Sequence, residues 1–254
     1  MHVLPLQKGI LYGPVHSRRL GRSLGINLLP TTCKLCSFDC IYCHYERTQI
    51  KALHAEGVSF PAVAEILQAV EGALQGSLEL SYLTFSGNGE PTLHPRFAEI
   101  AAEVRRLRDK LRPEVRLALL SNSSTVHLSH VREALAMVDV PILKLDAGDR
   151  RTFAGINRPA LDVGLEGIIA GLKGIPGLVI QSLLVDGKVS NVCGEPYQAW
   201  LSALADIRPS LMQIYSTDRP VPETGIEIVG PVMLQRIAMD VEAGTGCRVQ
   251  AYWA

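Results

Sequence analysis

From about residue 25 onward, short apolar runs rich in β-forming residues alternate with longer segments whose apolar residues recur at helical spacing. Runs of the first kind predict strands, and apolar positions three and four residues apart predict amphipathic helices. The clearest helical stripe follows Ser59 and Pro61, a suitable N-cap and first-turn pair, and ends before Gly76. The predicted strands are 25–29, 80–85, 115–120, 140–145, 178–184 and 211–215, and the predicted helices are 63–74, 97–111, 127–137, 162–173, 195–206 and 231–243.

This order of elements predicts about six βα units. Parallel strands joined by right-handed crossover helices can curl into an open, partial barrel. The predicted fold class is α/β, a partial (β/α)6 TIM-like barrel, with a doubly wound open sheet as the alternative. No composition shift divides the chain, so residues 1–254 are interpreted as one domain, with a Pro- and Gly-rich loop at 218–230. We expect the functional residues in loops at the carboxyl ends of the strands.

The charge and hydropathy of the chain indicate which binding partners and which cellular compartment to expect. Lys plus Arg number 25, as do Asp plus Glu, so the formal charge is zero. A neutral chain has no overall field that attracts nucleic acid or an anionic membrane, although a local basic groove remains compatible with this count. No apolar run reaches the ~18 residues that a membrane helix needs, and the N-terminus has no signal-peptide core. We expect a cytoplasmic protein with no membrane partner, for which nucleic acid is not favoured.

Four of the six cysteines lie within the stretch Cys33–Cys43. Disulfide frameworks are typical of shorter, secreted chains with dispersed cysteines, so this clustering indicates metal binding. Cys36, Cys40 and Cys43 form a CxxxCxxC pattern, and three thiolates around a cubane iron-sulfur cluster leave one iron open to another donor. A zinc site is the alternative, although zinc ribbons separate two CxxC pairs by a longer stretch. Cys33 is a spare thiol, a redox partner or an alternative ligand, and of these we favour a position outside the cluster.

The CxxxCxxC pattern, with Tyr42 directly before its last cysteine, resembles the signature of the radical S-adenosylmethionine (SAM) superfamily. Further blocks are similar to the branch of that superfamily grouped with wyosine-tRNA synthetase relatives. They are YGPVHSRRLGRSLGIN at 12–27, FSGNGEPTLHP at 85–95, KLDAGD at 144–149 and INRP at 156–159, with a weaker match, QIYSTDRP, at 213–220.

The resemblance implies a partial (β/α)6 barrel that binds a [4Fe-4S] cluster through Cys36, Cys40 and Cys43. It also implies that SAM binds the unique iron through its amino and carboxylate groups. Reductive cleavage of SAM would then yield methionine and a 5′-deoxyadenosyl radical, which abstracts hydrogen from a substrate. By the same resemblance, a flavodoxin or ferredoxin is the expected electron donor.

Positions for the SAM contacts follow from the same resemblance. Gly87, Asn88, Gly89 and Glu90 occupy the Gly-Gly-Glu position of the family, with Asn88 where many members have glycine. Glu90 is expected to hold the SAM ammonium through a charge-assisted hydrogen bond. A simple turn at the end of the strand is the alternative, because Gly, Asn and Pro all favour turns.

Other SAM contacts are expected around the strand ends. Tyr42 would approach the adenine, or only pack beside the cluster. Asn122 and Ser123 end the third predicted strand, where relatives bind the ribose or carboxylate of SAM, although such a stretch also caps helices. Gln181 and Ile214 are expected in the adenine pocket.

Charged residues inside the predicted barrel form a second group of candidates. Lys144 and Asp146 alternate with apolar neighbours on the fourth strand, so both should face the interior. They pair with each other, or they contact SAM or substrate, and Lys144 could form a Schiff base with a carbonyl substrate. Arg18, Arg19 and Arg22 either bind an anionic substrate or the SAM carboxylate, or form a solvated basic turn.

The sequence leaves the substrate open and assigns no residue a catalytic role. The leading hypothesis is a radical SAM enzyme, oxidoreductase-like or lyase-like. The alternatives are an activase that installs a radical on a partner protein, and a tRNA- or peptide-modifying enzyme. The wyosine enzymes carry additional N-terminal cysteines, and none precedes Cys33. A non-enzymatic iron-sulfur protein that transfers or senses electrons is the alternative from another class.

Overall fold

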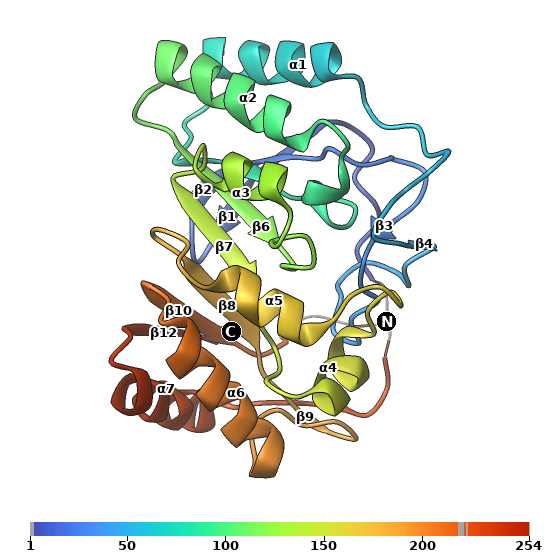
Figure 1. The fold of residues 1–254 in the computed structure, drawn as a ribbon. Coiled ribbons are helices and arrows are strands. Elements are labelled where there is room, and N and C mark those ends of the chain that lie inside the picture. The colour runs from blue at the N-terminus through green and yellow to red at the C-terminus, as the bar shows by residue number, and fades with distance from the viewer. Residues whose placement is uncertain (1–2, 218–220, 222, 254) are drawn as a thin grey trace.

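A curled sheet of eight strands forms the centre of the computed structural model, which describes residues 3–217, 221 and 223–253 (Figure 1). Seven strands run parallel, and the first strand pairs antiparallel at one edge. In spatial order they are β1 (Leu11–Ser17), β2 (Gly21–Ile26), β5 (Tyr82–Phe85), β6 (Arg116–Ser121), β7 (Val140–Lys144), β8 (Val179–Leu183), β10 (Leu211–Tyr215) and β12 (Val249–Tyr252).

Helices cover the outer side of this sheet (Figure 1). They are α1 (Val63–Gln75), α2 (Phe97–Leu111), α3 (Ser129–Leu135), α4 (Arg150–Asn157), α5 (Leu165–Leu172), α6 (Gly194–Ile207) and α7 (Pro231–Thr245). Shorter elements lie outside the main sheet: β3 (Leu35–Cys36) pairs with β4 (Ile50–Lys51), β9 (Val185–Gly187) pairs with β11 (Ile226–Ile228), and η1 (Pro91–Leu93) is a 3₁₀ turn.

The helices pack on the sheet through the apolar stripes that the sequence predicts. The stripe of α1 is buried in the same core as Phe85 of β5 and Phe97 of α2. The rings of Phe85 and Phe97 meet edge to face, 5.6 Å between centroids, which is a favourable aromatic geometry. Because this core occupies the outer side of the sheet, the inner side is left for polar groups and cavities.

The predicted fold class is confirmed, because helices cover the outer side of the curl and a doubly wound sheet would carry them on both faces. The six predicted strands and the predicted helices are present, with the first strand at Gly21–Ile26 instead of 25–29. The elements that were not predicted are β1, α4 and β12, together with the short elements β3, β4, β9, β11 and η1. Residues 218–220 of the QIYSTDRP block lie outside the described residues.

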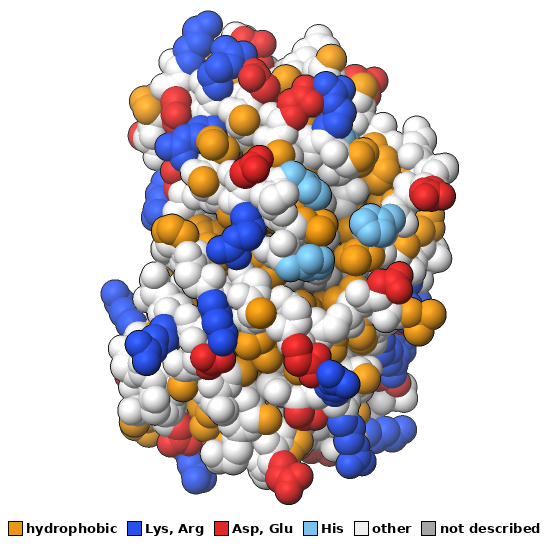
Figure 2. Space-filling view, viewed as in Figure 1, with side chains coloured by type: hydrophobic (Ala, Val, Ile, Leu, Met, Phe, Trp, Pro, Cys, Tyr) orange, Lys and Arg blue, Asp and Glu red, His pale blue; other side chains and the backbone are white. Residues whose placement is uncertain are grey.

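The surface carries no single-sign patch on the face seen in Figure 2. Lys and Arg side chains alternate there with Asp and Glu, and His side chains gather near a hollow in the middle. Within the described part of the chain, no helix is both long and apolar enough to span a bilayer.

Candidate active site

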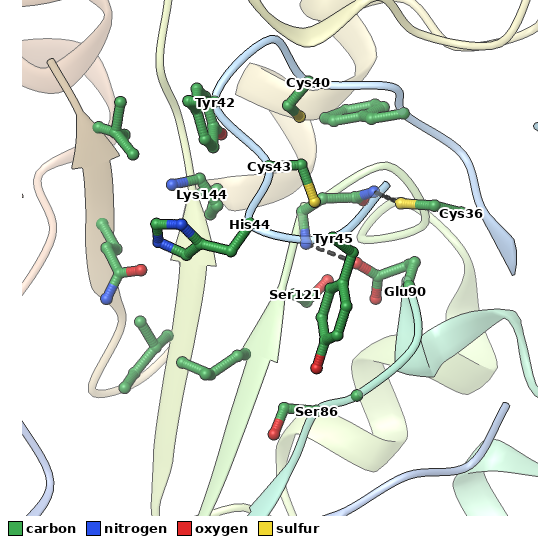
Figure 3. A pocket seen from close by; sticks show the side chains of 18 of the residues that line it. Cys36, Cys40, Tyr42, Cys43, His44, Tyr45, Ser86, Glu90, Ser121 and Lys144 are labelled. Atoms are coloured by element: carbon green, nitrogen blue, oxygen red, sulfur yellow. Dashed lines mark hydrogen bonds between the residues drawn. The ribbon is translucent and has the colours of Figure 1, made fainter. Parts of the chain in front are cut away.

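A cavity of about 310 Å³ lies where the cysteine loop covers the carboxyl ends of the central strands (Figure 3). Ligand pockets in proteins have volumes of roughly 300–1,000 Å³. The cavity brings together eleven of the residues predicted from sequence: Arg19, Cys36, Cys40, Tyr42, Cys43, Gly87, Gly89, Glu90, Asn122, Lys144 and Gln181. It does not bring in Asn88, Ser123, Asp146 or Ile214, whose side chains have other partners.

The cysteine loop is anchored on both sides by backbone hydrogen bonds. On one side, the Leu35 amide donates to the Asn88 carbonyl (3.0 Å), and the Glu90 amide donates to the Leu35 carbonyl (3.1 Å). On the other, the Ile41 amide donates to the Ile156 carbonyl (2.9 Å) at the end of α4. The INRP block is thus explained in part by structure, because it is the segment that the loop pairs with.

Two asparagine amides lie beside cysteine sulfurs. Nδ2 of Asn122 is 3.4 Å from Sγ of Cys36, and Nδ2 of Asn157 is 3.5 Å from Sγ of Cys40. Burial raises the pKa of Cys40 to about 12 and also raises the pKa of Cys36, so both thiols stay neutral unless a metal replaces their protons. Hydrogen bonds to sulfur tune the potential of iron-sulfur clusters, so these amides suit a cluster.

The three cysteines predicted to hold the cluster lie at one site. Cys36, Cys40 and Cys43 are free thiols that line the same cavity. Soft thiolates suit an iron-sulfur cluster, and three of them leave one iron open to another donor. Zinc ribbons separate two CxxC pairs by a longer stretch than the three residues between Cys36 and Cys40, so the residues present fit the cluster.

Glu90 is buried at the cavity wall on the same side as Cys36 of the cysteine loop (Figure 3). Its Oε1 accepts hydrogen bonds from the amide and the hydroxyl of Thr92 (3.1 and 2.6 Å), and its Oε2 accepts one from the Asn122 amide (2.6 Å). Burial raises the pKa of Glu90, and these hydrogen bonds oppose that effect. A carboxylate has about four lone-pair sites, so Oε2 retains capacity for a cationic ligand.

Gly89 explains why the Glu90 loop can approach the cysteine loop so closely. A Cβ at Gly89 would lie 1.6 Å from the Leu35 carbonyl oxygen, and the residue has a φ of +143°. Only glycine satisfies both conditions without strain. Asn88 has a structural function instead, because its side chain is buried and binds the backbone of Gln7 and the Pro30 carbonyl, away from the cavity.

Asp146 is the centre of a buried polar network below the cavity. Its Oδ1 accepts from the Leu183 amide (2.8 Å) and lies 3.4 Å from Nζ of Lys144. Its Oδ2 accepts from Nδ2 of Asn157 (2.7 Å) and from the Tyr42 hydroxyl. The predicted pairing of Lys144 with Asp146 is therefore present, and Asp146 itself supports the residues around Cys40.

Lys144 projects from β7 into the cavity. Its Nζ lies 4.9 Å from the ring centroid of Tyr42 and 5.2 Å from that of Tyr215, and it donates to the Tyr215 hydroxyl (3.3 Å). Burial lowers the pKa of Lys144, but Asp146 and Tyr215 raise it more, so the pKa lies above its usual value. The amine is consequently a protonated cation.

The register of the last strands decides which residues reach the cavity. Gln181 pairs with Gln213 across β8 and β10, and the Tyr215 hydroxyl donates to the Gln181 side chain (3.2 Å). Side chains alternate along a strand, so Tyr215 faces the cavity while Ile214 faces outward into the helix-covered core. Ser123 also points elsewhere, since its hydroxyl donates to the Lys144 carbonyl (2.8 Å).

Comparison with known proteins identifies the family. The family model described as "Radical SAM superfamily" matches residues 31–176, more than half of the chain and all of the cysteine loop. The chain belongs to the radical SAM superfamily. Members of this superfamily use a [4Fe-4S] cluster and SAM, and the cavity contains the three cysteines that the family pattern requires.

Relatives of this chain include two UPF0026 proteins. The chain is 35% identical over 225 residues to the one from Methanocaldococcus jannaschii, covering 86% of this chain and 66% of that protein. It is 32% identical to the one from Synechocystis sp., covering 84% of this chain and 77% of that protein. This chain thus spans about two thirds of the length of the archaeal relative.

Solved structures of low sequence identity share the fold. One is described as TYW1 with a lysine-pyruvate adduct bound (TM-score 0.61, 15% identity, 87% of this chain and 73% of that one). Another is a radical SAM methyltransferase from Sphaerobacter thermophilus (TM-score 0.64, 13% identity, 91% of this chain and 66% of that one). The predicted membership of the radical SAM superfamily is confirmed by the family model, and these structures show that the fold is shared.

Several residues that line the radical SAM cavity or contact its cysteines were missed by the sequence reasoning. Lys34 is buried beside Cys36, and its Nζ donates to the Glu46 carbonyl (2.9 Å). Tyr12 enters from β1, and burial raises its pKa to about 12, so its hydroxyl stays protonated. Asn157 reaches Cys40 from a helix that was not predicted. In the sequence, these residues were marked only by their position, either inside a block similar to radical SAM relatives or next to the cysteines.

Proposed function

We propose that this protein cleaves SAM reductively at a [4Fe-4S] cluster held by Cys36, Cys40 and Cys43, and thereby abstracts hydrogen from a small-molecule substrate. One observation supports this most strongly: three thiols of one loop and the Glu90 carboxylate line the same cavity. When bound there, the cluster and SAM supply the electron and the 5′-deoxyadenosyl radical that start the chemistry.

The residues of the chain bind and orient in this proposal. Glu90 accepts hydrogen bonds from the SAM ammonium, and Asn122 positions Glu90 through its backbone amide. Lys34 and Lys144 place positive charge near the thiolates, which opposes the cost of gathering negative charge in a buried loop. Tyr42 covers the network of Asp146 and keeps water from it.

We do not propose a Schiff base at Lys144. A Schiff base forms from a neutral amine, and the pKa of Lys144 is raised by its contact with Asp146. Its ammonium instead provides a fixed cation at the edge of the cavity.

A reductant is required by radical SAM enzymes in general, and we propose a flavodoxin or ferredoxin in the cytoplasm, where thiols stay reduced. Radical installation on a protein and modification of a tRNA or peptide remain the alternative uses of the same site. They differ from the proposal in requiring a macromolecule for turnover.

The first test measures 5′-deoxyadenosine formed from SAM by anaerobically reconstituted, dithionite-reduced protein. We expect product from the wild type and none from the Cys36→Ala, Cys40→Ala, Cys43→Ala variant. Protein that binds the cluster but never cleaves SAM would move the assignment to electron transfer or sensing. Protein that retains only zinc would refute the cluster assignment itself.

A second test concerns Glu90. Hydrogen bonds to charged groups contribute about 1.5–3 kcal/mol, so Glu90→Gln should weaken SAM binding roughly 10- to 150-fold. The matched control is Glu99→Gln, because Glu99 pairs with Arg96 on the surface of α2, outside the cavity. Equal SAM affinities of the two variants would contradict the assigned contact.

A further inference from the structure

A second cavity, of about 220 Å³, adjoins the cysteine-lined cavity on the inner side of the sheet. It lies between β1, β2, the turn that joins them and Tyr215 of β10. The two cavities share six lining residues, namely Tyr12, Arg19, His44, Ser86, Leu120 and Tyr215. A ligand in the second cavity would therefore contact one bound in the first.

The lining of the second cavity has positive and neutral groups but no acidic ones among the described residues. Two arginines, two histidines and several hydroxyls face it, whereas the whole chain has equal numbers of basic and acidic residues. Its polar lining consists of His16, Ser17, Arg18, Arg19, Ser23, His44, Thr84 and Ser86 with the hydroxyls of Tyr12 and Tyr215. An acid-free, basic cavity in a neutral protein attracts anions.

Arg19 differs from its basic neighbours in the same block. Arg18 donates to the Trp253 carbonyl, and Arg22 forms an ion pair with Glu79 on the surface. The guanidinium of Arg19 lies 4.5 Å above the Tyr215 ring, and the described residues give it no carboxylate and no hydrogen-bond acceptor. Its five N–H donors are available at the junction of the two cavities.

The position of Arg19 is fixed by the turn that carries it. The amides of Arg19 and Leu20 both donate to the Ser17 hydroxyl (3.2 and 3.1 Å), and the Leu20 side chain is buried against the sheet. Stacking on the Tyr215 ring holds the guanidinium plane in place. A preorganised guanidinium fork binds the two oxygens of a carboxylate or phosphate with little loss of entropy.

We propose that this cavity binds the anionic end of the substrate, a carboxylate or phosphate group of a small molecule, with Arg19 as its anchor. The inference rests on the proposed function, since it makes the second cavity the substrate side of the same site. The rest of the substrate then extends toward the cysteine-lined cavity past Tyr12 and Ser86. The cavity is smaller than the range for drug-sized ligands, in agreement with a small metabolite.

The test labels arginines of the cluster-loaded, full-length protein with phenylglyoxal and locates them by mass spectrometry. Millimolar inorganic phosphate or acetate should slow the labelling of Arg19 at least tenfold and leave Arg22, the matched surface control, unchanged. Protection by phosphate alone would assign a phosphate ester, and protection by acetate alone would assign a carboxylate. Unchanged labelling of Arg19 with both anions would overturn the proposal.

Two variants separate this site from the SAM site. Arg19→Gln should lose anion binding, measured by calorimetry, while its SAM affinity stays within twofold of the wild type; Arg22→Gln should retain both. If Arg19→Gln weakens SAM binding tenfold, Arg19 holds the SAM carboxylate and the substrate assignment is wrong. Because anion binding is measured without SAM cleavage, its failure is distinguishable from failure of the proposed function.

Discussion

Replacing Asp146 by alanine is the most direct probe of the network below the cavity. The carboxylate is fully buried. It accepts hydrogen bonds from the backbone amide of Leu183, the side-chain amide of Asn157 and the hydroxyl of Tyr42, and the Lys144 ammonium lies 3.4 Å away. Removing it leaves these donors without their acceptor.

The expected loss of unfolding free energy follows from these contacts. Each buried donor left without an acceptor costs about 1–3 kcal/mol, and removing one partner of a buried ion pair costs about 3–5 kcal/mol. The terms overlap, so we expect about 3–5 kcal/mol in total for Asp146→Ala. For a chain of this length each kcal/mol lowers Tm by roughly 2–4 °C, which predicts a decrease of roughly 6–20 °C.

Urea unfolding of cluster-free, reduced protein measures this loss without contributions from bound metal. Asp146→Asn keeps the shape and an acceptor but not the charge, so it should lose less than Asp146→Ala. The control is Asp206→Ala, because Asp206 pairs with Lys173 (2.6 Å) on the surface, where ion pairs contribute under ~1 kcal/mol. A loss below ~1 kcal/mol for Asp146→Ala as well would refute the argument that this carboxylate supports the loop.

Three further predictions follow from the geometry. Gly89→Ala should lose both the cluster and SAM binding, because its Cβ would lie 1.6 Å from the Leu35 carbonyl oxygen. Iron analysis and SAM titration measure the two losses. An unchanged iron content would contradict the prediction. Cys33→Ala should keep the full iron content of a four-iron cluster, since Cys33 does not line the cavity. Burial raises the pKa of Asp139, but Arg108 lowers it more, so the pKa lies below 3.8. Asp139→Asn should therefore have a lower unfolding free energy than the wild type at pH 7. This difference should disappear as the pH falls from 3.8 through the lower pKa of Asp139 in the folded protein. A difference that persists in stronger acid would show that it does not come from the ionised carboxylate.

The order of strands and helices predicted the barrel well, because the apolar runs of the strands and the helical spacing of apolar residues were both clear in the sequence. The segments that were missed have physical reasons. Gly13 and Pro14 interrupt β1, and Pro lacks the amide that a central strand needs, so the segment does not show strand alternation. β12 has only four residues and follows the helix that ends at Thr245, so its apolar pattern is too short to be distinguished from a loop.

The site was predicted in outline for a similar reason. The cysteine spacing is local in sequence, so it identifies the cluster loop without tertiary information. Side-chain direction is not local in this sense. Ile214 and Tyr215 are neighbours in sequence, yet the pairing of β10 with β8 sends one outward and the other into the cavity. A shift of one residue reverses every such assignment.

By itself, the sequence determined the order of strands and helices, the three cysteines of the cluster loop and the Gly-rich turn before Glu90, because each depends on residues close together in the chain. Only the tertiary structure decided which distant groups meet. It joined Asn157 to Cys40, Asp146 to Tyr42 and the arginine turn to the cavity. Such contacts arise when the sheet curls and helices close on it, and no local pattern encodes that closure.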